Sequence, residues 1–94
     1  DVFIVALGEA AEAKAFSLLT WSRDAGLWAA MGYAGRSLKS QMKAADKAGT
    51  RFAVILGEDE IAGDFVTLRD MSSSEQQQVP MPDIINKLCA EVKN

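Results

Sequence analysis

The chain has 94 residues, 49% hydrophobic and 24% charged, a composition that suits one globular domain and excludes intrinsic disorder. Its single cysteine excludes a disulfide framework and suits a reducing cytosol, and its lack of histidine excludes any site built on imidazole. The net charge of −3 argues against bulk nucleic-acid binding, and no apolar run approaches the roughly 20 residues that cross a bilayer.

The first strand and helix are predicted from a change in pattern at Gly8. Residues 2–7 are a continuous apolar run, typical of a strand buried on both faces. Residues 9–25 contain neither proline nor glycine and end at Gly26, which predicts a helix. Trp21 lies outside its apolar arc, where it either marks a contact surface or folds over its own core edge. The arc predicted to face the core contains Ala11, Ala15, Phe16, Leu18, Leu19 and Ser22.

A second strand and helix follow. Residues 27–31 are apolar and precede a glycine-containing stretch, which indicates a short strand. Ser37 is a suitable N-cap for a helix over residues 38–48 that Gly49 ends. The positions of this helix predicted to face inward are Leu38, Met42 and Ala45.

The remaining half predicts three strands and a helix. Residues 51–56 form another buried run. In residues 65–71 the side chains alternate as in a strand with one face more buried than the other. A serine turn at 72–74 leads to an edge strand at 76–79. The last helix covers 83–93, with Ile84, Ile85 and Leu88 facing inward.

This order predicts an α/β fold with helices on both faces of a mixed five-stranded sheet, in strand order 2-1-3-4-5 with strand 4 antiparallel. Ligands of such sheets bind at the carboxyl ends of the strands, where the connections diverge. The residues expected at this crevice are Gly8, Glu9, Tyr33, Gly35, Arg36, Gly57, Glu58 and Glu60.

Two charge clusters are candidate binding features. Glu58, Asp59 and Glu60 form an acidic turn, which serves either as a solvated turn or as a set of hydrogen-bond acceptors for a ligand. A basic stripe lies on the outer side of the 38–48 helix, where it either follows a phosphate backbone or is an ordinary solvated face. Its members are Arg36, Lys39, Lys43 and Lys47.

The segment after Gly8 does not favour a nucleotide cofactor. Residues 8–13 lack the further glycines of a dinucleotide loop and contain two glutamates that repel phosphate. Glu9 and Glu58 stand where receiver-type phosphoacceptor chemistry needs aspartates. Cys89 fits a packed thiol better than a reactive one.

One part of the chain carries a family resemblance. The basic helix and next strand, residues 36–60, end in Gly-Glu-Asp-Glu, and Val-Thr-Leu-Arg-Asp-Met follows at 66–71. With these motifs the chain resembles the C-terminal anticodon-binding domain of histidine–tRNA ligase, a class II aminoacyl-tRNA synthetase. The resemblance implies a three-layer α/β/α domain, excised from a longer synthetase, that spans residues 1–94.

The resemblance also implies partners. The domain would read the anticodon of tRNA(His), while a separate core, which binds ATP and magnesium, attaches histidine to the tRNA. The fragment alone would not be catalytic and would bind no cofactor or metal, and the parent enzyme would be a cytoplasmic homodimer.

Site residues follow from the same resemblance. Arg36 and Lys39 would contact phosphates or base edges, with Lys43 next along the stripe. Glu58 and Glu60 would accept hydrogen bonds from bases, with Glu60 the stronger candidate, and Arg69 and Asp70 complete the set. The serines at 72–74 depart from the family's Glu-Thr-Gly turn.

Other functions remain open at this point. The same fold occurs in threonine, proline and glycine ligases, and a regulatory paralogue that lacks activity would share it. A protein–protein interaction domain that uses Trp21 and the first helix is the alternative from a different class.

Overall fold

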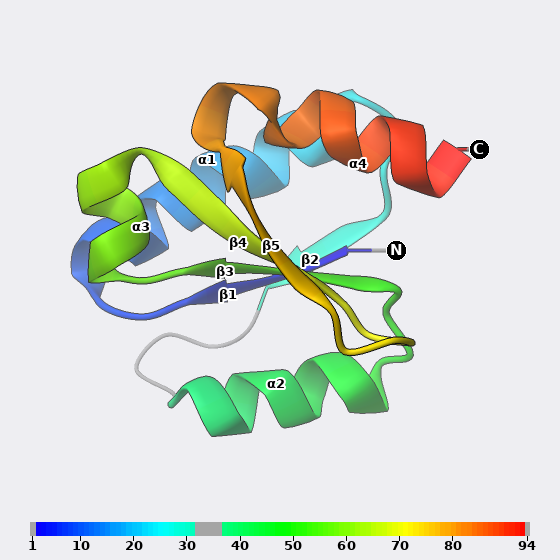
Figure 1. The fold of residues 1–94 in the computed structure, drawn as a ribbon, viewed down its shortest axis with the longest axis horizontal. Helices are drawn as coiled ribbons and strands as arrows, with labels where there is room; N and C mark the ends of the chain where they lie inside the picture. Colours follow the sequence, from blue (N-terminus) through cyan, green and yellow to red (C-terminus); the bar gives the residue numbers. More distant parts are fainter. Residues whose placement is uncertain (1, 32–36, 94) are drawn as a thin grey trace.

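The centre of the sheet is made by the two most apolar segments of the chain. A computed structural model describes residues 2–31 and 37–93, in which five strands form one sheet in the order β2-β1-β3-β4-β5 (Figure 1). β1, β2 and β3 are parallel, whereas β4 is antiparallel to both β3 and β5, so the predicted order and strand directions are confirmed. The strands are β1 (Val2–Ala6), β2 (Ala29–Met31), β3 (Phe52–Leu56), β4 (Phe65–Asp70) and β5 (Gln76–Pro80).

The helices cover the two faces of the sheet unequally. In Figure 1, α1 and α4 lie on one face and α2 lies alone on the other. The helices are α1 (Glu9–Asp24), α2 (Leu38–Lys47), α3 (Glu58–Gly63) and α4 (Ile84–Lys93), the last preceded by a 3-10 turn, η1 (Met81–Asp83). None of the helices within the described ranges has the length and apolarity needed to cross a membrane.

Two apolar cores follow from the alternation of side chains along the strands. Ile4 of β1 and Val54 of β3 belong to the larger core, which α1 and α4 close with Leu18, Ile84 and Leu88. Their neighbours in sequence point to the other face, where a smaller core contains Phe3, Val5, Ala45 and Ile55. Within residues 2–31 and 37–93, α2 is the helix that closes the small core, and its position depends on few apolar contacts.

Every predicted strand and helix is present, but three expectations about local structure are wrong. The acidic turn is the short helix α3, since Glu60 accepts a hydrogen bond from the backbone N–H of Gly57 at 2.8 Å and so caps the first turn. Phe16 does not face the core but is 65% exposed, because the buried face of α1 is narrower than its apolar arc. Leu38 is likewise 42% exposed.

The buried residue of α2 that takes the place of Leu38 is polar. Gln41 is 1% exposed, and its side-chain amide pairs with both backbone groups of Ala6. Its Oε1 accepts from the Ala6 N–H at 3.1 Å, and its Nε2 donates to the Ala6 carbonyl at 2.8 Å. Among the described residues, β2 pairs with β1 as far as Ile4, and Gln41 pairs with β1 two residues further along, at Ala6. This contact ties α2 to the carboxyl end of β1.

We therefore predict that Gln41→Leu lowers the free energy of unfolding by about 2–4 kcal/mol, because it leaves a buried N–H and a buried carbonyl of Ala6 unpaired. Gln78→Leu is the matched control, since Gln78 is exposed on β5 and its loss is expected to cost less than about 0.5 kcal/mol. Urea denaturation of both variants measures the difference. Equal, small losses would contradict the role given to Gln41.

Candidate nucleic-acid interface

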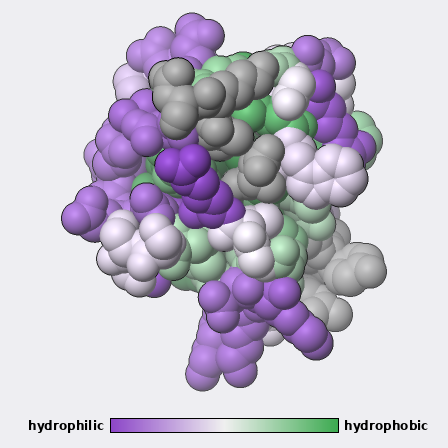
Figure 2. All heavy atoms as spheres, turned by 90° about the vertical axis from the view of Figure 1, so that its right-hand side faces the viewer, coloured by the Kyte–Doolittle hydropathy of each residue, from purple (hydrophilic) through white to green (hydrophobic). Residues whose placement is uncertain are grey.

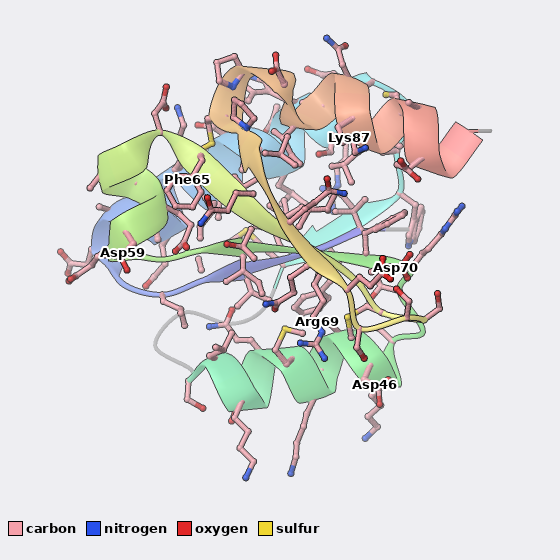
Figure 3. The ribbon with its side chains drawn as sticks, viewed as in Figure 1. Asp46, Asp59, Phe65, Arg69, Asp70 and Lys87 are labelled. Carbon is pink, nitrogen blue, oxygen red and sulfur yellow. The ribbon has the colours of Figure 1, made fainter. Side chains whose placement is uncertain are left out.

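The candidate residues fall into two groups at opposite ends of the sheet. Asp70 pairs with Phe52, the first residue of β3, whereas Glu58 lies two residues beyond Leu56, the last residue of that strand. Five residues of β3 separate them, roughly 13 Å of extended chain. Figure 3 accordingly shows Asp59 at one end of the sheet and Asp70 at the other. The two groups do not form one compact site.

The predicted crevice at the carboxyl ends of β1 and β3 is present. A backbone hydrogen bond from the Leu7 N–H to the Leu56 carbonyl, 2.9 Å long, holds the two chain segments together where the strands end. Beside it lies a hollow of about 230 Å³ with mainly apolar walls. Its lining residues are Leu7, Gly8, Glu9, Ala10, Ala11, Glu58, Ile61 and Ala62. Of the residues expected at this crevice, Tyr33, Gly35 and Arg36 lie outside the described residues.

The two glutamates of α3 are in different states. Glu60 is half-buried: one carboxylate oxygen accepts from the Gly57 N–H at 2.8 Å, and the other accepts from the Thr67 hydroxyl at 3.3 Å. Glu58 and Asp59 are exposed, and only Glu58 lines the hollow. Glu60 therefore has a structural role in α3, whereas Glu58 is exposed at the hollow, where a ligand can reach it.

The lysines of α2 form an exposed basic surface. Ser37 caps the helix through its hydroxyl, which accepts from the Ser40 N–H at 3.2 Å. Lys39, Lys43 and Lys47 are all exposed, opposite the buried Gln41 and Ala45, as the helical spacing predicts. In Figure 2, hydrophilic side chains project from the lower edge of the molecule, where α2 lies in Figure 1. Among residues 2–31 and 37–93, the single ion pair joins Lys87 to Glu91, so none of the three lysines is neutralised by a carboxylate there.

Arg69 and Asp70 are adjacent in sequence but lie in different environments. The Asp70 carboxylate accepts from the Ser72 hydroxyl at 2.7 Å and from the Ser72 N–H at 2.9 Å, and so closes the turn after β4. These bonds, helped by Ser73 and by the charge of Arg51, hold the pKa of Asp70 below its ordinary value despite partial burial. An ionised Asp70 is thus part of the hairpin.

Arg69 lies on the side of the sheet that α2 covers (Figure 3). Its Nη1 donates to Gln76 Oε1 across the strand pair at 3.4 Å, and its buried Nε has no partner among the described residues. Thr67 and Gln78, paired in register, extend the same face. The sequence analysis did not predict the Gln78 amide or the Thr67 hydroxyl as groups of the site, although the alternation along residues 65–71 places Thr67 on the same face as Arg69.

Comparison with known proteins agrees with this arrangement. A family model described as an anticodon binding domain matches residues 1–91. The chain is 48% identical over 88 residues to the histidine–tRNA ligase of Symbiobacterium thermophilum and 40% identical over 92 residues to that of Nocardia farcinica. These matches cover 94% and 98% of this chain. They cover 20% and 22% of the two ligases, so the chain spans about a fifth of the length of the curated relatives it matches.

Solved structures show the same relation. The apo histidyl-tRNA synthetase of S. aureus superposes with a TM-score of 0.87 and 30% identity, over 93% of this chain and 22% of that one. The RNA-binding domain of threonyl-tRNA synthetase from Cryptosporidium parvum superposes with a TM-score of 0.85 over 96% of this chain and 23% of that one. Its 16% identity supports a shared fold alone.

The contrast between the two glutamates leads to a prediction about stability. Glu60→Ala removes the acceptor that caps α3 and is expected to lower the free energy of unfolding by about 0.5–2 kcal/mol. Glu58→Ala, two residues away with the same loss of charge, is expected to change it by less than about 0.5 kcal/mol. Thermal and urea melts of both variants decide this. If Glu60→Ala is as stable as Glu58→Ala, the cap does not contribute to stability.

Proposed function

The chain belongs to the family of anticodon-binding domains, and on this premise we propose that it recognises the anticodon loop of tRNA(His) as one domain of a histidine–tRNA ligase. The observation that carries the proposal is the match to histidine–tRNA ligases over nearly the whole chain, 48% identical in one case. The chain's exposed chemistry supports it, since a basic helix surface lies beside an edge with an exposed carboxylate.

Binding of this kind needs two sets of contacts. Single-stranded RNA is read when bases splay out of a loop and meet side chains that hydrogen-bond to their edges, while cationic side chains neutralise the phosphates. On this chain, Lys39 and Lys43 supply local positive charge in a domain whose net charge is −3. Glu58 supplies an acceptor for an amino or imino group of a base. In this scheme α2 positions the RNA backbone, and the carboxyl end of the sheet recognises the base.

The position of α2 brings the start of its basic surface to the end of the sheet where Glu58 lies. The Gln41–Ala6 hydrogen bonds hold the first half of α2 against the carboxyl end of β1. That end is also where Glu58 lines the hollow. Lys39 and Glu58 are therefore at the same end of the sheet, whereas Arg69 and Asp70 are nearer the other end. In this proposal Arg69 meets the loop from β4, and Asp70 serves by holding the hairpin.

The rest of the reaction is assigned to the rest of the parent protein. We propose that a separate core binds ATP and magnesium and attaches histidine to tRNA(His), and that the parent is a cytoplasmic homodimer. In this proposal the 94 residues contribute recognition, and the chemistry belongs to the core. A regulatory paralogue would bind the tRNA without charging it, so aminoacylation by the full-length protein separates the two possibilities.

The lysine surface gives a first prediction for the full-length protein. Lys39→Ala with Lys43→Ala is expected to weaken binding of all tRNAs about equally and to reduce the slope of log K against log salt by about 1 to 2, because two phosphate contacts are lost. Lys14→Ala with Lys87→Ala is the matched control, since it removes the same charge from α1 and α4. Equal effects of the two pairs on the slope would indicate that α2 is a solvated face only.

The second prediction concerns specificity. Glu58→Ala is expected to weaken binding of tRNA(His) by about tenfold to a hundredfold, since a base donor is left unpaired, and to affect an anticodon-substituted tRNA little. Asp59→Ala is the control: Asp59 is also exposed but does not line the hollow. Filter binding with both tRNAs measures the ratio. Equal losses for the two tRNAs would remove Glu58 from base recognition.

A further inference from the structure

Three consecutive glutamines on the outermost strand, β5, lie in three different environments. The side chains of Gln76, Gln77 and Gln78 are all exposed. The amide oxygen of Gln76 accepts a hydrogen bond from Arg69 Nη1 at 3.4 Å, and Gln77 lines a hollow of about 340 Å³ on the side of α4. No hydrogen bond joins the amide of Gln78 to another residue of the described chain, so this amide is available to a ligand.

The register of the sheet places Gln78 and Gln77 on opposite sides. Gln78 pairs with Thr67 of β4, which in turn pairs with Ile55, a residue of the small core. Gln77 pairs with Leu68, a residue of the larger core. Because side chains directly opposite each other share a face of the sheet, Gln78 lies on the side that α2 covers and Gln77 on the side of α4.

Thr67 and Gln78 form a close pair of polar side chains. The Asp70 N–H donates to the Glu75 carbonyl at 2.9 Å, so this pair is a hydrogen-bonded position of the ladder. Such positions alternate, and Thr67 and Gln78, three residues away, occupy a non-hydrogen-bonded one, where Cβ atoms are roughly 4.5–5.5 Å apart. The Thr67 hydroxyl donates to Glu60 Oε2 at 3.3 Å, which leaves its oxygen as an acceptor. The pair thus presents an amide beside a hydroxyl acceptor.

The charges on the two sides of β4 and β5 favour RNA on the side of Gln78. Arg69 and the lysine-bearing helix α2 lie on that side (Figure 3). On the other side, the hollow beside Gln77 has three carboxylates in its lining, those of Asp70, Glu75 and Glu91. Carboxylates repel a phosphate backbone, whereas cationic side chains attract it. We therefore expect an RNA loop that reaches β5 to contact Gln78 and to avoid Gln77.

From these observations we propose that Gln78 is a specificity-determining residue, whose amide forms two hydrogen bonds with the edge of one anticodon base. The inference rests on the proposed function and adds to it a side chain that the sequence analysis did not identify. A carboxamide donates and accepts at neighbouring atoms, and the Watson–Crick edge of a base presents a donor next to an acceptor. The wrong base at this position leaves both partners without their hydrogen bonds.

Thermodynamic cycles with the full-length protein test the proposal. The affinities of the wild type, Gln78→Ala and Gln77→Ala are measured for tRNA(His) and for three tRNAs that each have one anticodon base replaced. Gln77→Ala is the matched control, since it removes the same amide from the other side of the same strand. We expect Gln78→Ala to weaken binding of tRNA(His) about tenfold, but less than about twofold for one of the three replaced tRNAs, where the contact is already lost. Gln77→Ala should change no affinity by more than about twofold, and thermal melts check that both variants are folded.

Equal losses from Gln78→Ala for all four tRNAs would overturn the proposal, as would a loss no larger than that of Gln77→Ala. The failure of the proposed function looks different. If the wild type discriminates among the four tRNAs and Gln78→Ala discriminates equally well, the role of Gln78 is refuted and anticodon recognition stands. If the wild type itself binds all four tRNAs equally, anticodon recognition is refuted, and the inference with it.

Discussion

The pairing of the Gln41 amide with Ala6 is the contact on which the arrangement of the interface depends. α2 closes the small core through few apolar side chains, with Ala45 the main buried one, so packing alone defines its position weakly. Two hydrogen bonds from the Gln41 side chain to the backbone of Ala6 define both the height of α2 above the sheet and its rotation about its axis. With Gln41 turned inward, helical geometry places Lys39, Lys43 and Lys47 outward.

The same constraint explains how an acidic domain presents a basic surface. The carboxylates in the first turns of α1 and α3 lie toward the carboxyl edge and the larger core side, while the lysines share the face of α2 that points away from the sheet. Local rather than net charge then faces a phosphate backbone.

The strands and their order were predictable because continuous apolar runs identify the strands and short connections allow few sheet topologies. The exposed lysines were predictable from helical spacing. The burial of Gln41 was not predictable, since a pattern of apolar positions does not identify an amide that is buried to pair with a backbone.

The helix α3 was missed because it is six residues long and depends on Glu60, whose contact with Thr67 exists only once β4 is in place. The separation of Asp70 from Glu58 needed the register of β3 and β4, which the sequence does not contain.

The measurement that tests the account most directly is the affinity of the full-length protein for tRNA(His) and for the same tRNA with its three anticodon bases replaced. Both titrations are made at two salt concentrations, so that the contributions of phosphate contacts and of base contacts to the affinity can be distinguished. The account predicts that replacement weakens binding at least about tenfold at both concentrations, while the salt dependence of the two tRNAs stays the same. Equal affinity for the two tRNAs would contradict anticodon recognition by this domain.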